Sequence, residues 1–552
     1  MSGSSPRVLI VTGSLLTGAE ERALDTGKKQ WAAARASSGA WLDLHLKLGL
    51  LGRVGAIRRA AQGPGPGAEI ARRLMAEDPL AGLPELTEVA LATALRDEGV
   101  GFEVSTWSAL HADPRAAERL LAATDCVFAS STLLRDASEL RPLVRLVKRP
   151  HNRVVVGGAL VGILEGAWPD VPGVDLLALG WGERLVPAIC AWMRSGFTTL
   201  TPPPGGSLSR RGDTPLLRVG LPAERSLDAL PAPDWSLAEQ VHGRRFQAVS
   251  YESVRGCPFR CAFCNYPFLF DDSRYRTRSA EAIDRDWARL EAAGVRWISA
   301  LDSLFTVPRR RVEALCQRLI ARGSRVRWLC YARADDLCDP SLVQLMAEAG
   351  CVQVQIGAES GSQAQLDRMN KRCTVEQNLG ALARCREAGV TSLVTLIVGF
   401  PGETAATADA TLELLRQGQP DLCFISPFST KFTALPILEP AARARHGLVT
   451  EEGGASSFPA WRHASMDVAE AILRVEQMYA VMAEERLSLD GAAFYQGALG
   501  YRPEHRAPLL DLQREAARRG GAARLALRGL MALTWRGVLG QVAVLPGSPA
   551  DP

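Results

Sequence analysis

No apolar run in this 552-residue sequence is long enough to cross a membrane, and its positive and negative charges nearly cancel. A membrane-spanning helix needs about 20 consecutive apolar residues, so we expect no membrane-spanning segment. The formal net charge is only +4, whereas nucleic-acid-binding domains usually show a clear excess of basic residues. The sequence therefore predicts that neither a membrane nor a nucleic acid is a partner.

The N-terminal residues also lack the features of a secretory leader. The apolar run at residues 8–11 is short and has no basic segment before it, unlike a signal peptide. We therefore expect a cytoplasmic protein, in which thiols stay reduced. The 12 cysteines are accordingly not expected to form a disulfide framework, and most lie singly within apolar stretches.

Strands and helices alternate along residues 1–198, after a long insertion of helical pattern at about 18–80. Strands are expected at residues 7–13, 102–106, 126–130, 153–158 and 174–179, and helices at 83–98, 114–122, 136–147 and 184–195. Continuously apolar strands in such an alternation are typical of an α/β protein with a doubly wound, Rossmann-like parallel sheet. The carboxyl ends of its strands form a crevice that suits a ligand.

A segment rich in proline and glycine, residues 199–245, is expected to be a linker. The alternation then resumes over residues 246–432, with strands near 248–252, 296–301, 326–331, 351–356, 392–398 and 421–425. Six strand–helix units predict a partial (β/α)6 barrel of the TIM type, with its chemistry at the carboxyl ends of the strands. Residues 433–552 have a mainly helical pattern, and we expect them to cap the barrel and shape substrate specificity.

Three cysteines stand together directly after the first of these strands. Cys257, Cys261 and Cys264 have the spacing Cys-x3-Cys-x2-Cys in a loop that also contains glycine and proline. Such thiolates can each bind one iron of a cubane cluster and leave the fourth iron open. Soft thiolates also bind zinc, but a zinc site usually has a fourth Cys or His nearby, and the next cysteine is Cys316. The spacing therefore favours a 4Fe–4S cluster.

This spacing, with an aromatic residue before the third cysteine, resembles the radical S-adenosylmethionine superfamily. Further matches are residues 301–306 to its "DD-x-F-T" pattern, 357–361 to "G-x-E-S-G", 369–371 to "M-x-K" and 398–404 to "G-x-P-G-E-T". The resemblance covers roughly residues 246–430, and it implies a bound 4Fe–4S cluster and S-adenosylmethionine. The residues expected to contact S-adenosylmethionine are Phe263, Asp302, Ser303, Arg333, Glu359, Ser360 and Gly399.

Two of these residues have a second interpretation. Arg333 stands at a strand end, where its guanidinium can clamp the ligand carboxylate, but an ion pair with Asp335 explains it equally well. Gly399 and Gly402 would let the backbone approach the adenine ring, and a plain strand–turn connection needs glycine just as much.

A doubly wound domain before such a barrel resembles the cobalamin-binding branch of this superfamily. Residues 156–159 and 180–183 match its patterns, although Trp181 departs from the usual "G-E-G-E". The residues expected to line the corrin crevice are Thr12, Gly13, Ser14, Ser130, Ser131, Thr132, Gly157, Gly158, Gly182 and Glu183. The alternative is a set of ordinary turns that hold no ligand. His45 lies in a motif one residue too long for "D-x-H-x-x-G", so we expect no histidine ligand to cobalt.

The resemblance implies a class B methyltransferase that moves a methyl group from S-adenosylmethionine, through methylcobalamin, to a poorly reactive carbon of a small natural-product precursor. Members that methylate the indole 2-position of tryptophan in antibiotic biosynthesis give the specific hypothesis. In those members a glutamate downstream of the third cysteine is placed at the open iron, and Glu281 is the candidate here, although Ser279 and Glu281 also fit an ordinary helix start. Trp461 and His463 are candidates for substrate contact. A flavodoxin or ferredoxin is the expected electron donor.

Other functions stay open at this stage. A radical C- or P-methyltransferase that forms a 5'-deoxyadenosyl radical, or a cobalamin-dependent cyclase or mutase, fits the same architecture. A methylthiotransferase needs an N-terminal cysteine trio for a second cluster, but only Cys126 and Cys190 lie in that part of the chain. A cobalamin or redox sensor without catalysis is disfavoured by the complete set of strand-end motifs.

Overall fold

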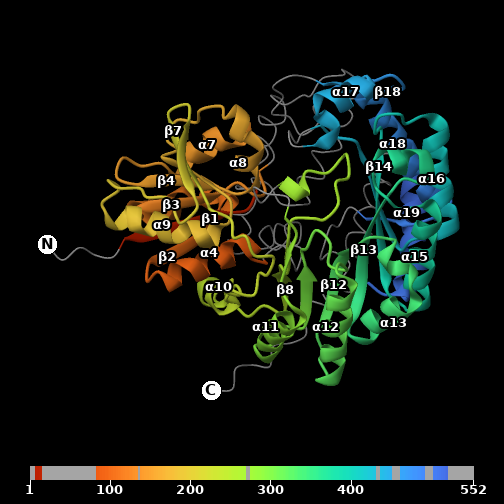
Figure 1. Ribbon diagram of the computed structural model, residues 1–552, viewed down its shortest axis with the longest axis horizontal. Coiled ribbons are helices and arrows are strands. Elements are labelled where there is room, and N and C mark those ends of the chain that lie inside the picture. Colours follow the sequence, from red (N-terminus) through yellow and green to blue (C-terminus); the bar gives the residue numbers. More distant parts are fainter. Residues whose placement is uncertain are drawn as a thin grey trace, which may run out of the picture.

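The computed structural model describes residues 6–14, 83–134, 137–268, 274–430, 435–450, 460–491 and 501–519. Two α/β units lie side by side: one holds the residues up to about 245, and the other holds the rest (Figure 1). The insertion at about 18–80, with His45, lies outside the described residues, so the expectation for His45 is not addressed by the structure.

The first unit contains the predicted doubly wound sheet. Its strand order is β2-β1-β3-β4-β5-β7-β6, and the five expected strands pair in parallel. They are β1 (Arg7–Thr12), β2 (Gly101–Thr106), β3 (Cys126–Ser130), β4 (Arg153–Gly157) and β5 (Leu176–Leu179). The central strands β1, β3 and β5 are almost wholly buried, because helices cover both faces of the sheet.

The helices of the first unit divide between the two faces. On one face lie α5 (Trp107–Ala112), α6 (Pro114–Ala122), α7 (Ala137–Val147) and α8 (Ala159–Leu164), and on the other lie α4 (Leu86–Asp97) and α9 (Gly182–Arg194). Asp113 caps α6 by accepting hydrogen bonds from two backbone N–H groups at its start, a common way to satisfy the free donors of a helix N-terminus.

Residues 207–218, inside the expected linker, form a hairpin that completes the first sheet. β7 (Thr214–Arg218) pairs in parallel with β5, and β6 (Ser207–Arg211) pairs with β7 in antiparallel fashion. Leu216 and Leu217 on β7 are buried, whereas Leu208 on the edge strand is exposed. The flanking prolines and glycines concealed these strands in the sequence. Farther along, α10 (Trp235–His242) packs against α4.

The second unit is an open barrel of seven parallel strands in the order β19-β15-β14-β13-β12-β11-β8. The six expected strands are β8 (Ala248–Tyr251), β11 (Trp297–Ala300), β12 (Arg327–Ala332), β13 (Cys351–Glu359), β14 (Thr391–Val398) and β15 (Leu422–Pro427). The seventh, β19 (Leu489–Asp490), comes from the tail. β8 and β19 are the two ends of this row, so the sheet is a partial barrel.

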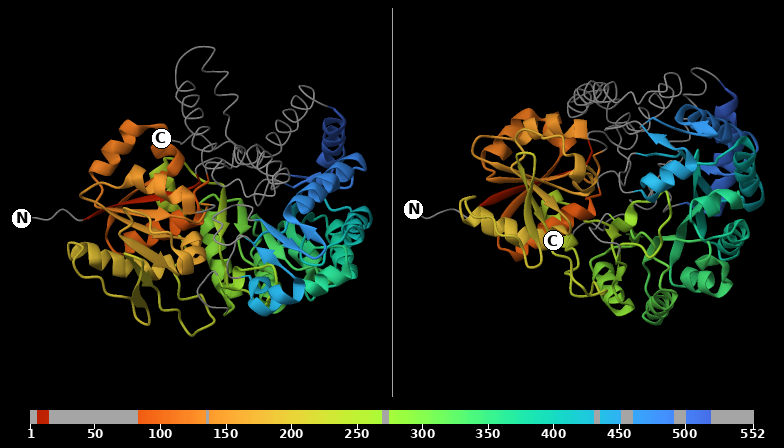
Figure 2. Two further views of the ribbon diagram at one scale, coloured as in Figure 1. Left: turned by 90° about the horizontal axis from the view of Figure 1, so that it is seen from above. Right: turned by 45° about the horizontal axis from the view of Figure 1, so that its top comes forward.

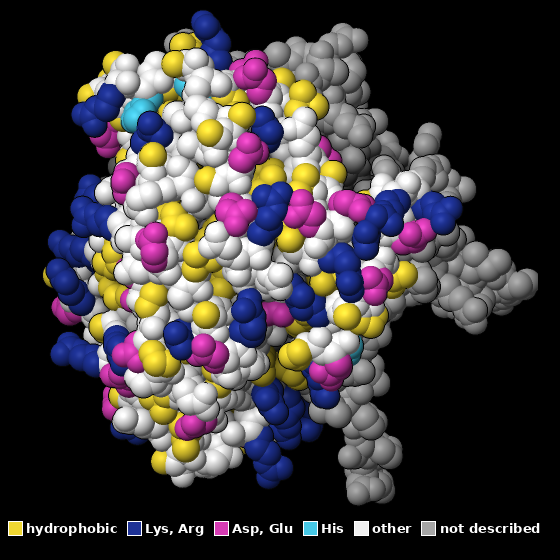
Figure 3. All heavy atoms as spheres, turned by 90° about the vertical axis from the view of Figure 1, so that its right-hand side faces the viewer, with side chains coloured by type: hydrophobic (Ala, Val, Ile, Leu, Met, Phe, Trp, Pro, Cys, Tyr) yellow, Lys and Arg dark blue, Asp and Glu magenta, His cyan; other side chains and the backbone are white. Residues whose placement is uncertain are grey.

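Helices surround the barrel on its outer side (Figure 2). They are α11 (Ala280–Ala292), α12 (Arg309–Ala321), α13 (Pro340–Glu348), α15 (Val375–Glu387), α16 (Ala405–Gly418) and α18 (Val468–Glu484), whereas the short α14 (Gln363–Arg368) follows the end of β13. Strand residues such as Val354 and Ile356 pack in one core with these helices. Figure 3 shows basic and acidic side chains interspersed over this helical face, in agreement with the small net charge.

The described part of the tail adds helices and a small sheet to the barrel. It contains α17 (Pro440–His446), α19 (Arg506–Arg518) and the strands β16 (Val449–Thr450), β17 (Trp461–His463) and β18 (Met466–Asp467). α18 begins with a capping box between Asp467 and Glu470. In the described part of the chain, no helix combines the length and the apolar character that crossing a membrane requires.

Candidate active site

The loop that carries the three cysteines is fastened to the barrel by several hydrogen bonds. Gly256 opens it with a φ of 78°, and a Cβ there would lie 2.3 Å from the carbonyl oxygen of Arg274, so this close approach requires glycine. The N–H of Ala262 donates to the Met369 carbonyl at 2.8 Å, and the Asn370 side-chain amide donates to the Arg260 carbonyl at 2.7 Å. The "M-x-K" segment thus holds the loop in place.

The three thiols lie in a partly buried, electropositive setting. Cys261 is buried, and Cys257 and Cys264 are half-buried. Burial raises the pKa of all three thiols, that of Cys264 to about 12, while the nearby charges of Lys371 and Arg333 lower the pKa of Cys257 and Cys261. Basic groups beside soft sulfur ligands fit an anionic iron–sulfur cluster.

The donor set itself fits a 4Fe–4S cluster. Cys257, Cys261 and Cys264 are three thiols on one loop, and each can bind a different iron of such a cluster. Soft thiolates are the ligands that these irons prefer.

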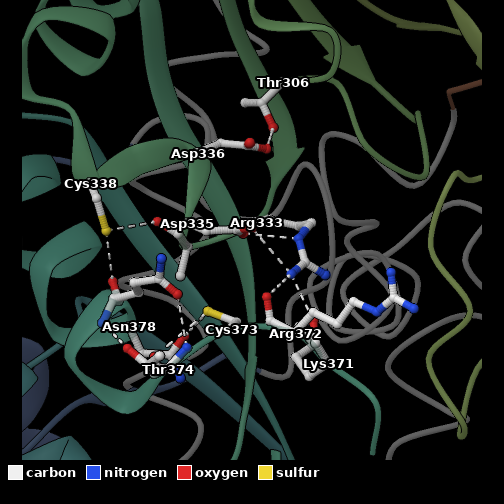
Figure 4. A network of polar contacts seen from close by, with 12 residues as sticks. Thr306, Arg333, Asp335, Asp336, Cys338, Lys371, Arg372, Cys373, Thr374 and Asn378 are labelled. Carbon is white, nitrogen blue, oxygen red and sulfur yellow. Dashed lines mark hydrogen bonds and ion pairs between the residues drawn. The ribbon is translucent and has the colours of Figure 1, made fainter.

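Arg333 makes the ion pair with Asp335 that was one of its two expected roles. Its Nε lies 2.9 Å from Asp335 Oδ1, and its Nη2 donates to the carbonyls of Lys371 and Arg372 at 2.7 and 2.9 Å (Figure 4). The guanidinium also lies over the ring of Phe259 on the cysteine loop, 3.9 Å from the ring centroid, a favourable cation–π distance. Arg333 thus joins β12, the "M-x-K" segment and the loop.

Glu359 and Lys371 form a buried ion pair at the end of β13. Lys371 Nζ lies 3.0 Å from Glu359 Oε1, and both side chains are only 8% exposed. Burial is the largest single influence and opposes the charge on Lys371, but Glu359 and Cys261 together raise the lysine pKa. Glu359 has a φ of 63°, rare for a residue with a side chain, and such strain often marks a functional position. The sequence placed Glu359 here but assigned no role to Lys371.

Three other residues expected at the S-adenosylmethionine site are engaged within the protein. Asp302 accepts from the N–H groups of Ser253 and Val254 at 2.6 and 2.9 Å, and burial raises its pKa to about 6. Ser303 donates to the Gly256 carbonyl at 2.6 Å. The hydroxyl of Ser360 lies 3.2 Å from that of Thr411 on α16. These contacts favour roles in holding the loop and strand ends.

Trp461 and His463, the candidates for substrate contact, pack against the turn that contains Gly399. Trp461 donates from its indole N–H to the Phe428 carbonyl at 2.9 Å, and its ring stacks on His463. His463 Nε2 lies 3.1 Å from the Gly399 carbonyl oxygen. A Cβ at Gly399 would lie 2.6 Å from the Ala471 side chain. Close packing therefore explains this glycine, and the two aromatic residues support its turn.

The small residues expected around a corrin gather at the carboxyl ends of β1, β3 and β4. Ser131 donates to the Gly157 carbonyl through both its N–H and its hydroxyl, each at 2.7 Å. Gly158 has a φ of 101°, and a Cβ there would lie 2.7 Å from the hydroxyl of Thr132. The two strand ends therefore meet closely only because glycine occupies position 158. The other small residues expected there also stand at or just after strand ends of this sheet: Thr12, Gly13, Ser14, Ser130 and Gly182.

A group of acids at the end of β1 was not identified from the sequence. Glu85 Oε1 accepts from the Gly13 N–H at 2.5 Å, and Glu88 Oε1 lies 2.8 Å from Nε2 of His242 on α10. Thr12 donates to Glu88 at 3.3 Å. Burial raises the pKa of Glu85 to about 7, with the neighbouring Glu88 adding to the effect and the Gly13 hydrogen bond opposing it. The helical spacing of Glu85 and Glu88 was visible in the sequence, but the burial of Glu88 and the contacts of both acids were not.

The side chain of Glu183, which was expected to contact cobalamin, forms an ion pair with a residue of the second unit. Its carboxylate lies 2.5 Å from Nη1 of Arg255, the residue before the cysteine loop. The Arg255 guanidinium also lies 4.5 Å from the ring centroid of Trp181, and Arg276 approaches the same ring at 5.3 Å. Trp181, which departs from the family pattern, therefore makes cation–π contacts with two arginines of the barrel unit.

Glu281 is not brought together with the three cysteines. It stands in the first turn of α11, its side chain is 58% exposed, and it lies 2.8 Å from Arg318 on α12. Ser279 caps this helix by accepting from the Ala282 N–H at 3.1 Å. The geometry thus agrees with the helix-start interpretation and gives no support to Glu281 as a cluster ligand.

Sequence comparisons find similarity mainly over the barrel unit. Residues 251–415 match the family model described as the Radical SAM superfamily. An anaerobic magnesium-protoporphyrin IX monomethyl ester cyclase from Cereibacter sphaeroides is 29% identical over 279 residues, which cover 48% of this chain and 45% of that protein. A protein named an uncharacterized methyltransferase, from Pyrococcus horikoshii, is 27% identical over 275 residues, which cover 48% and 58%. The chain spans about half the length of the curated relatives it matches.

Solved structures resemble the chain over both units. The radical S-adenosylmethionine methyltransferase TsrM from Kitasatospora setae, with cobalamin and a 4Fe–4S cluster bound, gives a TM-score of 0.59 at 19% identity, over 83% of this chain and 96% of that chain. The cobalamin-dependent S-adenosylmethionine radical enzyme OxsB gives 0.58 at 15% identity, over 84% and 76%. At such identities the similarity shows the fold. Residues 251–415 therefore match the Radical SAM superfamily model, and the two units together share the fold of TsrM and OxsB.

Proposed function

We propose that the protein is a methyltransferase that uses cobalamin, a 4Fe–4S cluster and S-adenosylmethionine to methylate a small natural-product precursor. The observation that carries the proposal is the junction between the two units. Glu183, at the edge of the crevice expected to hold cobalamin, pairs with Arg255, the residue before the cysteine loop. This contact supports the proposal, because methyl transfer requires the two cofactors to be held close together.

Each group of residues has a defined part in this proposal. Cys257, Cys261 and Cys264 would hold three irons, and Glu359 would bind the amine of S-adenosylmethionine beside Lys371. When bound, the cluster supplies electrons, S-adenosylmethionine supplies the methyl group, and cobalamin carries it. The protein's own contribution is to fix these sites relative to one another and to keep basic groups beside the sulfur ligands.

The indole 2-position of tryptophan is our specific substrate hypothesis. It is supported by the similarity to TsrM from Kitasatospora setae with tryptophan substrate and an S-adenosylmethionine analogue bound, which has a TM-score of 0.55 at 20% identity. Transfer to an electron-rich indole carbon needs no hydrogen abstraction from the substrate. A flavodoxin or ferredoxin is the proposed electron donor.

A second candidate is ring closure or radical methylation of another precursor. It is favoured by the match to the magnesium-protoporphyrin IX monomethyl ester cyclase, which is among the relatives with the longest aligned stretches. On this alternative a 5'-deoxyadenosyl radical would form in step with product.

Anaerobic turnover separates these functions. The reconstituted enzyme is incubated with methyl-labelled S-adenosylmethionine, cobalamin, reductant and tryptophan, and the products are followed by mass spectrometry. Labelled 2-methyltryptophan without 5'-deoxyadenosine supports the specific hypothesis. Deoxyadenosine in step with a product from another precursor supports the second candidate. Failure to consume S-adenosylmethionine, with cluster and cobalamin both bound, contradicts catalysis and favours a sensor.

A further inference from the structure

Two buried glutamines on the inner face of the barrel have no partner for their amides. Gln353 and Gln355 lie on β13, and each is only 1% exposed. Among the described residues, none hydrogen-bonds to the side-chain oxygen or nitrogen of either glutamine, so four buried polar atoms are unsatisfied. A buried polar atom without a partner costs about 1–3 kcal/mol. An arrangement this costly points to a ligand that completes it.

The direction of these side chains follows from the alternation of the strand. Val354 and Ile356 face the helices and pack in the outer core, so Gln353 and Gln355 face the opposite side, which is the inside of the barrel. Gln353 stands beside Leu329 of β12, and Gln355 stands beside Leu393 of β14.

Apolar clusters flank the glutamines on both sides. Leu329 packs with Ala248 and Trp297 toward β8, whereas Leu393 packs with Leu422 and residues of α19 toward β19. Tyr331 stands beside Gln355 on β12 and Thr391 stands beside Gln353 on β14, so the two amides belong to an uncharged polar strip between these apolar clusters. They carry no charge, which suits an uncharged polar group better than a carboxylate or an ammonium ion.

The glutamines lie on the same strand as Glu359, farther from its carboxyl end than the Glu359–Lys371 pair. A Cβ at Gly357 would lie 2.4 Å from Glu359 Oε1 and 2.9 Å from Lys371 Nζ, so the ion pair covers this glycine. Gln355 is two residues farther down the same strand and on the same face. Lys371 also lies 5.9 Å from the ring centroid of Phe263 on the cysteine loop. Phe263, the Glu359–Lys371 pair and the two glutamines therefore follow one another along one face of the barrel.

We infer that Gln353 and Gln355 bind an uncharged group that offers a hydrogen-bond donor and an acceptor side by side, such as an amide or the N–H and carbonyl of a lactam ring. This group is the end of the substrate remote from the reacting carbon, so its assignment to a substrate rests on the proposed function. A carboxamide side chain is itself a neighbouring donor and acceptor, and it recognises such a group through two parallel hydrogen bonds.

Thermal stability gives the first test. Gln353→Met and Gln355→Met replace each amide with an apolar side chain of similar size. In the holoenzyme without substrate, each should raise the melting temperature by about 2 °C or more, because an unsatisfied group is removed. Gln513→Met is the matched control: Gln513 is also buried, but it donates to the Ser488 carbonyl at 2.9 Å and accepts from the Asp490 N–H at 2.8 Å. Its substitution should lower the melting temperature. A similar fall in the β13 variants, or their failure to fold, overturns the inference.

Fragment binding gives the second test. 2-Pyridone presents an N–H beside a carbonyl, and N-methyl-2-pyridone lacks the donor. Ligand-observed NMR on the holoenzyme should detect 2-pyridone but not its N-methyl form, and the Gln353→Met/Gln355→Met double variant should lose at least about five-fold of the signal that Gln513→Met retains. Equal signals in the double variant, or none in the unsubstituted protein, contradict the site. Fragment binding without any methyl transfer would leave the site in place and refute the proposed function instead.

Discussion

Arg255 and Glu183 meet across the boundary between the two units, with Nη1 of the arginine 2.5 Å from Oε1 of the glutamate. Each side chain is only 13% exposed, and the arginine is also paired with Glu252. The arginine precedes the cysteine loop, and the glutamate stands in the first turn of α9. This contact therefore ties the position of the loop to the start of α9 in the first unit.

Loss of the charge on Glu183 should loosen this junction. We expect Glu183→Gln to lower stability by about 2 kcal/mol, because a buried, charge-assisted hydrogen bond is weakened. Methyl transfer should fall at least ten-fold while iron content stays unchanged. Melting temperature, iron analysis and labelled-methyl transfer measure the three effects.

Glu118 supplies the control for this prediction. Like Glu183, it lies in the first unit and pairs with an arginine, Arg149, but its side chain is 63% exposed. Such surface pairs contribute little to stability. Glu118→Gln should change none of the three measurements. Equal behaviour of the two variants would show that the Arg255–Glu183 contact does not position the loop.

Cys261 should be indispensable for iron binding. Cys261→Ala removes one of the three proposed sulfur ligands, so we expect loss of most of the iron and sulfide after anaerobic reconstitution and no detectable turnover. Cys423→Ala, at a fully buried cysteine of β15 remote from the loop, should keep its iron and lose only stability. Normal iron content in Cys261→Ala would refute the cluster assignment.

Much of the fold was predictable because its strands are apolar and separated by clear helix signals. The strand at 126–130 and the helix at 114–122 were predicted at their observed bounds, and the six expected barrel strands are all present. The hairpin at 207–218 was missed because prolines and glycines surround it, and β19 was missed because a two-residue strand has no periodicity.

The site was predictable only where a motif specifies it. The cysteine spacing and the residues around Glu359 located one edge of the barrel. Sequence alone could not show that Glu183 is paired with a residue 72 positions away, nor that Trp461 supports the Gly399 turn from behind. The glutamines of β13 occupy regular alternating positions, and only the packing around them shows that their amides are unsatisfied.

Glu281 should be dispensable for the cluster. Its exposed carboxylate is held beside Arg318 on the outer side of the barrel, so Glu281→Gln should bind as much iron as the unsubstituted protein and give an unchanged cluster spectrum. Iron analysis and electron paramagnetic resonance of the reduced cluster check this. A marked loss of iron or an altered signal would restore Glu281 as a ligand candidate.

Gly158 should be essential for cobalamin binding at the first sheet. Alanine there is strained by the positive φ, and its Cβ would lie 2.7 Å from the Thr132 hydroxyl and 2.8 Å from the Thr132 nitrogen. We expect Gly158→Ala to reduce cobalamin retention at least ten-fold, measured by absorbance after gel filtration. Gly101→Ala, in the same sheet but with open space around the added methyl, should retain cobalamin. Equal retention by both variants would place the corrin elsewhere.

Glu85 should make stability fall as the pH rises. Burial raises its pKa from 4.5 to about 7, so between these values the folded protein holds a proton that the unfolded chain has released. The contribution of Glu85 to the free energy of unfolding is therefore complete below about pH 4.5. It is lost as the pH rises through about 7, by an amount on the order of 3 kcal/mol. Glu85→Gln keeps a neutral side chain at every pH, so its melting temperature should decline less than that of the unsubstituted protein between pH 5 and 8. Glu103→Gln, at an exposed glutamate of β2, controls for loss of a negative charge. Parallel pH curves for the unsubstituted protein and Glu85→Gln would show that the pKa of Glu85 is not raised in the folded state.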